Sequence, residues 1–317
     1  MDAACVRPLG DYDTIGRFLE HFSDIPARTV AFDRIQKRMG NIEELLVGIE
    51  KKQTLDQMTH RCSSAKSETD RMALRKRVVD ELYEFPRPTS EKEILLGTGG
   101  ARPQTALLNN MMAIIVIGLP GSGKSTVSDY LSDKFGAIML DPDMAKRKLP
   151  EFEDNDVGAD LTHDESKTLI FGDSHMLGES LLQKCLLHRD SVVIQKIGDE
   201  RNSFHHLAEA FFSAGYRVHL VLVRANRETV IRRIIKRFQT TGRYVPLGMV
   251  YDKFSNNPTI TYYDALEELW GHESPYESFL MIRNDDHPII DANASRCKSS
   301  FLLDSSDIDG IRTRSSI

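Results

Sequence analysis

Uninterrupted runs of apolar residues, separated by amphipathic stretches, dominate the central part of the chain. Residues 113–117 (Ala-Ile-Ile-Val-Ile) show no polar alternation, which is typical of a strand buried on both faces of a parallel sheet. Similar runs follow at 137–140, 191–194, 216–223 and 278–282, and apolar residues at helical spacing fill the intervals. This alternation predicts an α/β domain with a mainly parallel sheet flanked by helices.

The residues before this region carry a helical pattern. Ile15, Phe18, Leu19 and Phe22 recur at helical spacing, and residues 27–52 contain a second stretch of this kind. Residues 62–69 are polar and predict a linker. We therefore expect an N-terminal helical region at 1–66, whose role is unknown and which we favour as a packing layer. A main domain should follow at 67–290, and residues 291–317, rich in Ser and Asp, predict a flexible tail.

Composition adds mainly exclusions. The 317 residues are 40% hydrophobic and 28% charged, as in ordinary globular proteins, and the formal net charge of −6 gives no reason to expect nucleic acid or an anionic membrane as a partner. The four cysteines lie far apart without a Cys-x-x-Cys pair, so neither a zinc site nor a disulfide framework is indicated. No leader or spanning segment is recognisable, and we expect a cytoplasmic protein.

A complete phosphate-loop motif follows the first predicted strand directly. The sequence Gly118-x-x-x-x-Gly123-Lys124-Ser125 lets the backbone N–H groups wrap around phosphates at the start of a helix. Lys124 would reach the β- and γ-phosphates and the Ser125 hydroxyl would ligate Mg²⁺, so ATP or GTP with Mg²⁺ is expected. The residues predicted to bind the nucleotide are Gly118, Leu119, Pro120, Gly121, Ser122, Gly123, Lys124, Ser125 and Thr126.

Two carboxylates follow the second predicted strand, at the edge of the sheet where open α/β folds bind ligands. In Asp141-Pro142-Asp143, one carboxylate can accept the proton of a phosphoryl acceptor and the other can hold the Mg²⁺ shell. Asp141 is the predicted metal ligand beside Ser125. The alternative is that either residue merely caps the following helix.

A helix with a dense basic face is predicted at 227–238, and a segment containing Gly242, Arg243 and Pro246 follows it. Most basic helix faces are simply solvated. In small P-loop kinases, however, such a segment is a lid whose arginines neutralise charge during phosphoryl transfer, and we favour a lid here.

The order of these motifs resembles the zeta-toxin family of P-loop kinases over roughly residues 70–285. The resemblance rests on the phosphate loop, on Asp141-Pro142-Asp143 and the residues after it, on 163–166 (His-Asp-Glu-Ser), and on 236–246 (Lys-Arg-Phe to Pro). It implies a kinase that phosphorylates the 3′-hydroxyl of the amino sugar in UDP-N-acetylglucosamine.

The resemblance also implies roles for particular residues. Asp143 looks like the general base, Lys124 like the phosphate-binding lysine, and Arg237 and Arg243 like the two lid arginines. Glu165 resembles a contact to the sugar nucleotide. Gln195 stands where the family commonly has a glutamate at the amino sugar, which leaves phosphoryl transfer intact but puts the acceptor's identity in question.

Partners and rival functions complete the sequence-based expectations. The family includes toxins neutralised by a small helical antitoxin, so an antitoxin in trans, or residues 1–66 acting in cis, is a possible partner. A kinase acting on another acceptor (a nucleoside, dinucleotide, antibiotic or nucleic-acid end) is the first alternative. A nucleotide-binding switch is the second, although the chain lacks an Asn-Lys-x-Asp guanine motif.

Overall fold

A computed structural model of the chain describes residues 11–315 apart from 155, 174–177, 270, 272–273 and 297–301. Its centre is one six-stranded sheet with the order β2-β3-β1-β4-β5-β6. Strands β1 to β5 run parallel and β6 is antiparallel to β5. The strands are β1 (Met112–Ile117), β2 (Ile138–Leu140), β3 (Val192–Gln195), β4 (Arg217–Arg224), β5 (Tyr276–Asn284) and β6 (Pro288–Ser295). The predicted mainly parallel sheet is confirmed.

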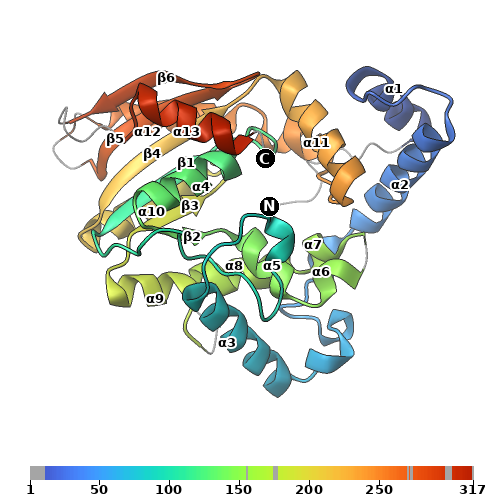
Figure 1. The fold of residues 1–317 in the computed structure, drawn as a ribbon. Helices are drawn as coiled ribbons and strands as arrows, with labels where there is room; N and C mark the ends of the chain where they lie inside the picture. The colour runs from blue at the N-terminus through green and yellow to red at the C-terminus, as the bar shows by residue number, and fades with distance from the viewer. Residues whose placement is uncertain are drawn as a thin grey trace.

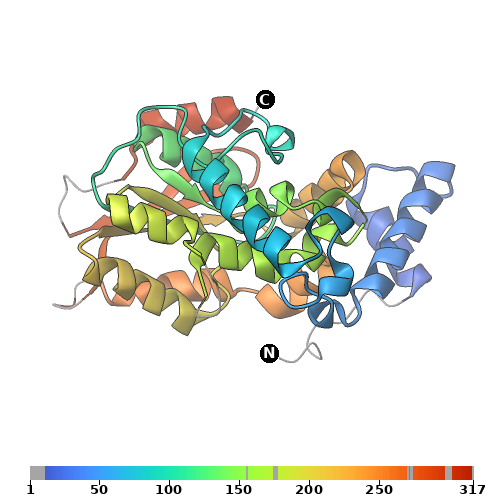
Figure 2. The ribbon, with the colours of Figure 1, turned by 90° about the horizontal axis from the view of Figure 1, so that it is seen from below.

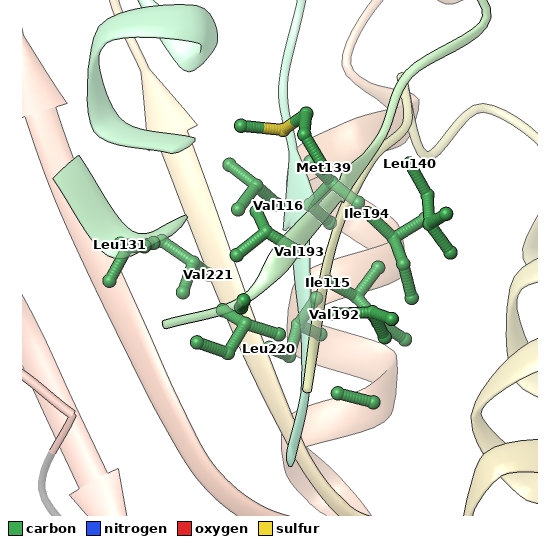
Figure 3. Close-up of a cluster of buried hydrophobic side chains, with 14 of the residues drawn as sticks. Ile115, Val116, Leu131, Met139, Leu140, Val192, Val193, Ile194, Leu220 and Val221 are labelled. Atoms are coloured by element: carbon green, nitrogen blue, oxygen red, sulfur yellow. The ribbon is translucent and has the colours of Figure 1, made fainter. Parts of the chain in front are cut away.

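Strand β1 is the hydrophobic centre of the sheet. All six of its residues are buried, and it pairs with β3 on one side and β4 on the other. Figure 3 shows side chains of β1, β2, β3 and β4, with Leu131 from a covering helix, packed into one apolar cluster. Burial on both faces explains why the strand sequence has no polar alternation, and it fixes the loop that follows β1 rigidly to the sheet.

Helices cover both faces of the sheet, as Figure 2 shows from the edge. The first face carries α4 (Lys124–Lys134) and α13 (Ser305–Ser315), and the second carries α9 (Leu181–His188), α10 (Arg201–Ser213) and α12 (Asn257–Glu267). Helix α3 (Glu68–Glu84) packs against α9 and against α5 (Pro142–Lys148) and α8 (His163–Phe171). Short helices α6 (Glu151–Asp154) and α7 (Gly158–Leu161) join α5 to α8, and a π-helical turn occupies Met249–Phe254.

The N-terminal residues form a helical hairpin beside the sheet domain. Helices α1 (Tyr12–Phe22) and α2 (Val30–Leu46) lie next to α11 (Arg227–Thr241) in both ribbon views (Figures 1 and 2). Together they build a second hydrophobic core, separate from the sheet core. Its buried members include Ile15, Leu19, Phe32, Met39 and Ile42 from the hairpin and Val230, Ile231, Ile234, Ile235 and Phe238 from α11. The described part of the N-terminal region therefore packs against α11.

The C-terminal region differs from the flexible tail that its composition predicts. Residues 288–295 form β6, and α13 packs on α4 with Ile308 and Ile311 buried. Lys134 of α4 pairs with Asp307 at 2.5 Å. The prediction was wrong because tertiary burial of two isoleucines and an ion pair outweigh a polar local sequence. The domain boundaries at 66 and 290 stay predictions.

Candidate active site

The phosphate loop joins β1 to α4 and is braced from the far side by β5. Gly121 and Gly123 have φ values of +82° and +96°, which side-chain-bearing residues rarely adopt. A Cβ on Gly123 would lie 2.1 Å from the Asn284 amide nitrogen, and that nitrogen donates to the Ser122 carbonyl at 2.9 Å. The backbone conformation of the loop therefore requires glycine here, and there is no room for a larger residue at Gly123.

Lys124 begins α4 and folds back over the loop. Its ammonium group donates to the carbonyl oxygens of Gly118 at 2.6 Å and Leu119 at 2.9 Å. Burial, with the lid arginines nearby, lowers the pKa of Lys124 to about 8, although Asp141 and Asp143 oppose this shift. Ser125 follows in the first turn of α4 and its side chain is exposed, so it is accessible to a cation.

The two carboxylates after β2 have different environments. Asp141 caps α5 by accepting the Asp143 N–H at 2.9 Å, which confirms the capping alternative for this residue without removing its second oxygen from use. The Asp143 carboxylate pairs with Arg243 and with Lys146 at 3.1 Å. Despite burial, these cations hold the pKa of Asp143 well below its usual range, whereas burial and the Asp143 charge raise the pKa of Asp141 to about 7.

The predicted lid lies against these groups. Helix α11 ends at Gly242 with φ of +75°, and the chain then turns so that Arg243 reaches Asp143. Arg237 projects from the last turns of α11, and its Nε is buried without a hydrogen-bond partner among the described residues. Burial and the neighbouring Arg243 charge lower the pKa of Arg237 to about 10. A buried, unsatisfied donor on a cation is suited to receiving an anion.

The structure thus brings five of the predicted site residues together. Lys124 lies within the electrostatic reach of Asp141, Asp143, Arg237 and Arg243, which come from β1–α4, β2–α5 and the lid. Segments more than 100 residues apart in the sequence meet at the carboxyl edge of the sheet, as expected for an open α/β fold.

Gln195 and Glu165 are placed differently. Gln195 ends β3 and pairs in register with Val116 of β1, so it lies one strand from the phosphate loop. Its side chain is partly exposed, and its amide lies 3.6 Å from the Met139 sulfur. Glu165 is fully buried. Its two oxygens accept from Arg71 at 2.7 and 2.5 Å, and Arg75 at 2.7 Å and Thr54 at 2.6 Å complete its partners. In this arrangement Glu165 ties α8 to α3 and offers no open oxygen to a ligand.

Several residues near Asp143 were given no role by the sequence analysis. His163 and Asp160 lie within electrostatic range of Asp143 and Lys146, and burial lowers the pKa of His163 to about 4 and raises that of Asp160. Glu91, which pairs with Arg147 at 2.7 Å, adds charge near Asp141 and both lid arginines. Glu91 begins a short 3-10 helix (Glu91–Glu93) over 50 residues before Asp143, and nothing in the local sequence marks it.

A cavity of about 660 Å³ opens beside the first turn of α4. Its lining includes Gly123 of the loop, Thr126 of α4, Arg233 of α11, His287 of the β5–β6 turn and Pro288 at the start of β6. Arg233 also donates to the carbonyls of Asn284 at 2.9 Å and Asp285 at 2.7 Å, which ties the lid helix to this turn. The cavity reaches Gly123 of the phosphate loop and is large enough for a nucleoside.

The sheet carries a phosphate loop, a pair of carboxylates and a segment with two arginines. These features define the class of P-loop kinases. Comparison with known proteins identifies the family: residues 105–262 match the family model described as Zeta toxin, and this part of the chain belongs to the zeta toxin family. None of the curated proteins matches the chain.

Among solved structures, one similar chain comes from the PezAT chromosomal toxin-antitoxin system of Streptococcus pneumoniae. It is 14% identical, with a TM-score of 0.49, over 79% of this chain and 95% of that chain. A likeness of this degree carries no argument about this protein.

Among the described residues, no helix is long and apolar enough to cross a membrane.

Proposed function

We propose that this chain is an ATP- or GTP-dependent kinase that phosphorylates the 3′-hydroxyl of UDP-N-acetylglucosamine. Membership of residues 105–262 in the zeta toxin family supports the kinase class. The single observation that supports the reaction most is the meeting of Asp143 with Arg243 beside the phosphate-loop Lys124. A base, a phosphate-binding cation and a guanidinium near the transferred phosphate are the protein groups that phosphoryl transfer requires.

The donor would bind with its phosphates on the loop N–H groups and its nucleoside in the cavity beside α4. Lys124 would exchange its two carbonyl partners, Gly118 and Leu119, for phosphate oxygens. The unpartnered Nε of Arg237 would gain a phosphate oxygen. Mg²⁺ on Ser125 and Asp141 would neutralise phosphate charge. A phosphate loop at the start of α4, with a buried guanidinium Nε that has no hydrogen-bond partner among the described residues, fits such an anion.

Transfer would be in line. The acceptor oxygen forms a bond to the γ-phosphorus while the bond from that phosphorus to the β,γ-bridging oxygen breaks, and the nucleoside diphosphate leaves. Asp143 takes the hydroxyl proton. Because Asp143 is paired with Arg243, the acceptor hydroxyl must displace this guanidinium, which can then turn to the transferring phosphoryl group.

The acceptor is tested by identifying the product. We expect incubation with ATP, Mg²⁺ and UDP-N-acetylglucosamine to yield a UDP-sugar heavier by one phosphoryl group, detected by mass spectrometry, with the new phosphate on the 3′-oxygen. A chain carrying Lys124→Ala should form none. Absence of this product together with another phosphorylated compound from a metabolite extract would overturn the acceptor assignment.

A kinase with another acceptor is the second candidate, and two observations favour it. Gln195 replaces the glutamate common in the family, and Glu165 is closed off by Arg71 and Arg75. The metabolite extract in the same experiment separates the two candidates. An antitoxin partner belongs to the first candidate, and its test is whether a helical protein copurifies and lowers product formation.

A further inference from the structure

The second hydrophobic core has a side that reaches the active site. The lid residues Phe238 and Tyr244 are both buried there and pack edge to face, with ring centroids 5.2 Å apart. Tyr244 is the immediate neighbour of Arg243, whose side chain instead lies on Asp143. Consecutive residues of the lid therefore point in two directions, one into the second core and one into the site.

Helix α2 contacts the lid at Tyr244. The Tyr244 hydroxyl donates to the Glu43 carboxylate at 2.5 Å, and only 8% of Tyr244 and 5% of Glu43 are exposed. Burial raises the pKa of Glu43, although the Tyr244 hydrogen bond opposes this shift. Buried polar groups of this kind are expensive to leave unpaired, so the contact restrains the backbone at Tyr244 strongly.

Arg38 adds a second contact one turn away on α2. Its guanidinium lies 5.1 Å from the centroid of the Phe238 ring and donates to Asp156 at 2.5 Å. A Cβ on Gly242 would lie 2.9 Å from the Arg38 Nη2, so the left-handed turn that ends α11 passes directly beneath this side chain. Lid residues on both sides of Arg243 are thus fixed by α2.

We propose that Glu43 is a positioning residue for the lid: by holding Tyr244 it places Arg243 at the phosphate loop and Asp143. This inference rests on the proposed function, because Arg243 acts there on the transferred phosphate. It assigns a role to a residue outside 105–262, the part that matches the family model. Nucleotide affinity should therefore depend on a side chain that touches no ligand.

The test uses the full chain and MgATP alone, so it does not depend on the acceptor. Glu43→Ala is compared with Glu44→Ala, the next residue on the same helix, which is exposed. Amide hydrogen exchange reports on residues 238–247, and displacement of a fluorescent ATP analogue reports affinity. We expect Glu43→Ala to speed exchange in this segment and to weaken MgATP about tenfold, the usual scale for losing a buried charged hydrogen bond, while Glu44→Ala changes neither.

A double-variant cycle separates positioning from general destabilisation. Arg243→Ala alone should also weaken MgATP binding about tenfold. The double variant Glu43→Ala/Arg243→Ala should bind MgATP no more weakly than either single variant, because each substitution removes the contact between Arg243 and the phosphate. Tyr244→Phe, which deletes only the hydroxyl, replaces Glu43→Ala if that variant folds poorly. It should likewise speed exchange in residues 238–247 and weaken MgATP binding. Multiplying losses, or unchanged exchange in Glu43→Ala and Tyr244→Phe, would overturn the inference. If Arg243→Ala leaves affinity unchanged, the proposed role of Arg243 fails, whereas faster exchange in Glu43→Ala would still show that α2 holds the lid.

Discussion

Two groups at the phosphate site have pKa values that are shifted towards neutral pH, one downwards and one upwards. Lys124 has its pKa lowered to about 8 by burial, and Asp141 has its pKa raised to about 7 by burial and by Asp143. A bound phosphate chain favours the charged lysine, and a bound cation favours the charged carboxylate. Nucleotide binding should therefore be accompanied by uptake of protons at one pH and by release of protons at another.

We expect binding of MgATP to take up about half a proton at pH 8, where Lys124 is half protonated before binding and Asp141 is mostly ionised. At pH 6, Lys124 is already charged and Asp141 holds its proton, so binding should release a proton instead. Calorimetry in buffers of different ionisation enthalpy measures both. Asp141→Asn should abolish the release at pH 6 and leave the uptake at pH 8, and uptake at both values of pH would contradict the assignment of Asp141 to the metal.

At the scale of secondary structure, a buried ion network joins α3 to the helices after β2. Arg71 is fully buried. It donates to Glu165 at 2.7 and 2.5 Å and to Glu151 of α6 at 2.7 Å. Arg75 adds a third contact. Burial opposes ionisation, but these arginines lower the pKa of Glu165 to about 2.

This network predicts acid sensitivity. A carboxylate whose folded pKa is depressed contributes stability above its unfolded pKa, near 4.5, and loses it as pH falls towards about 2. The contribution at neutral pH is on the order of 3 kcal/mol. Glu165→Gln should lower the free energy of unfolding at pH 7 by about that amount and flatten its decline between pH 4.5 and 2, measured by urea titration. An unchanged decline, matching that of the Glu44→Gln control, would contradict the network's role.

The sequence predicts the sheet and the phosphate loop well because both depend on local patterns. Buried parallel strands are continuously apolar, and the loop glycines are required by positive φ at Gly121 and Gly123. It does not predict the environment of Glu165, because Arg71 and Arg75 lie about 90 residues earlier, on a helix whose own pattern gives no sign of the pairing. The local pattern likewise does not show that α8 ends at Phe171, where Gly172 adopts φ of +81°, or that α9 begins only at Leu181.

At the scale of the whole molecule, the N-terminal hairpin completes the lid. The residues lining the cavity beside α4 all come from positions beyond 120, so the described part of 11–66 does not line this cavity. The hairpin instead buries one face of α11, including Val230, Ile234 and Phe238. Inhibition in cis by direct occlusion of this cavity is therefore not supported by the arrangement.

A shortened chain beginning at Ser67 should lose solubility and MgATP affinity. Removing the hairpin exposes the apolar face of α11, and each buried aliphatic side chain contributes roughly 1.5–3 kcal/mol. Sedimentation and nucleotide binding would measure both effects. A soluble shortened chain with higher activity than the full chain would show instead that the hairpin inhibits the enzyme.

The central claim is that Asp143 removes the acceptor's proton beside a triphosphate held by Lys124. Its most direct test is the turnover of Asp143→Asn at saturating ATP, with ATP affinity measured in parallel and the acceptor taken from the product identification. The account predicts affinity within a few-fold of the unsubstituted chain and turnover lower by about 10²-fold or more. Unchanged turnover would contradict it and leave Asp143 as no more than a partner for Arg243 and Lys146.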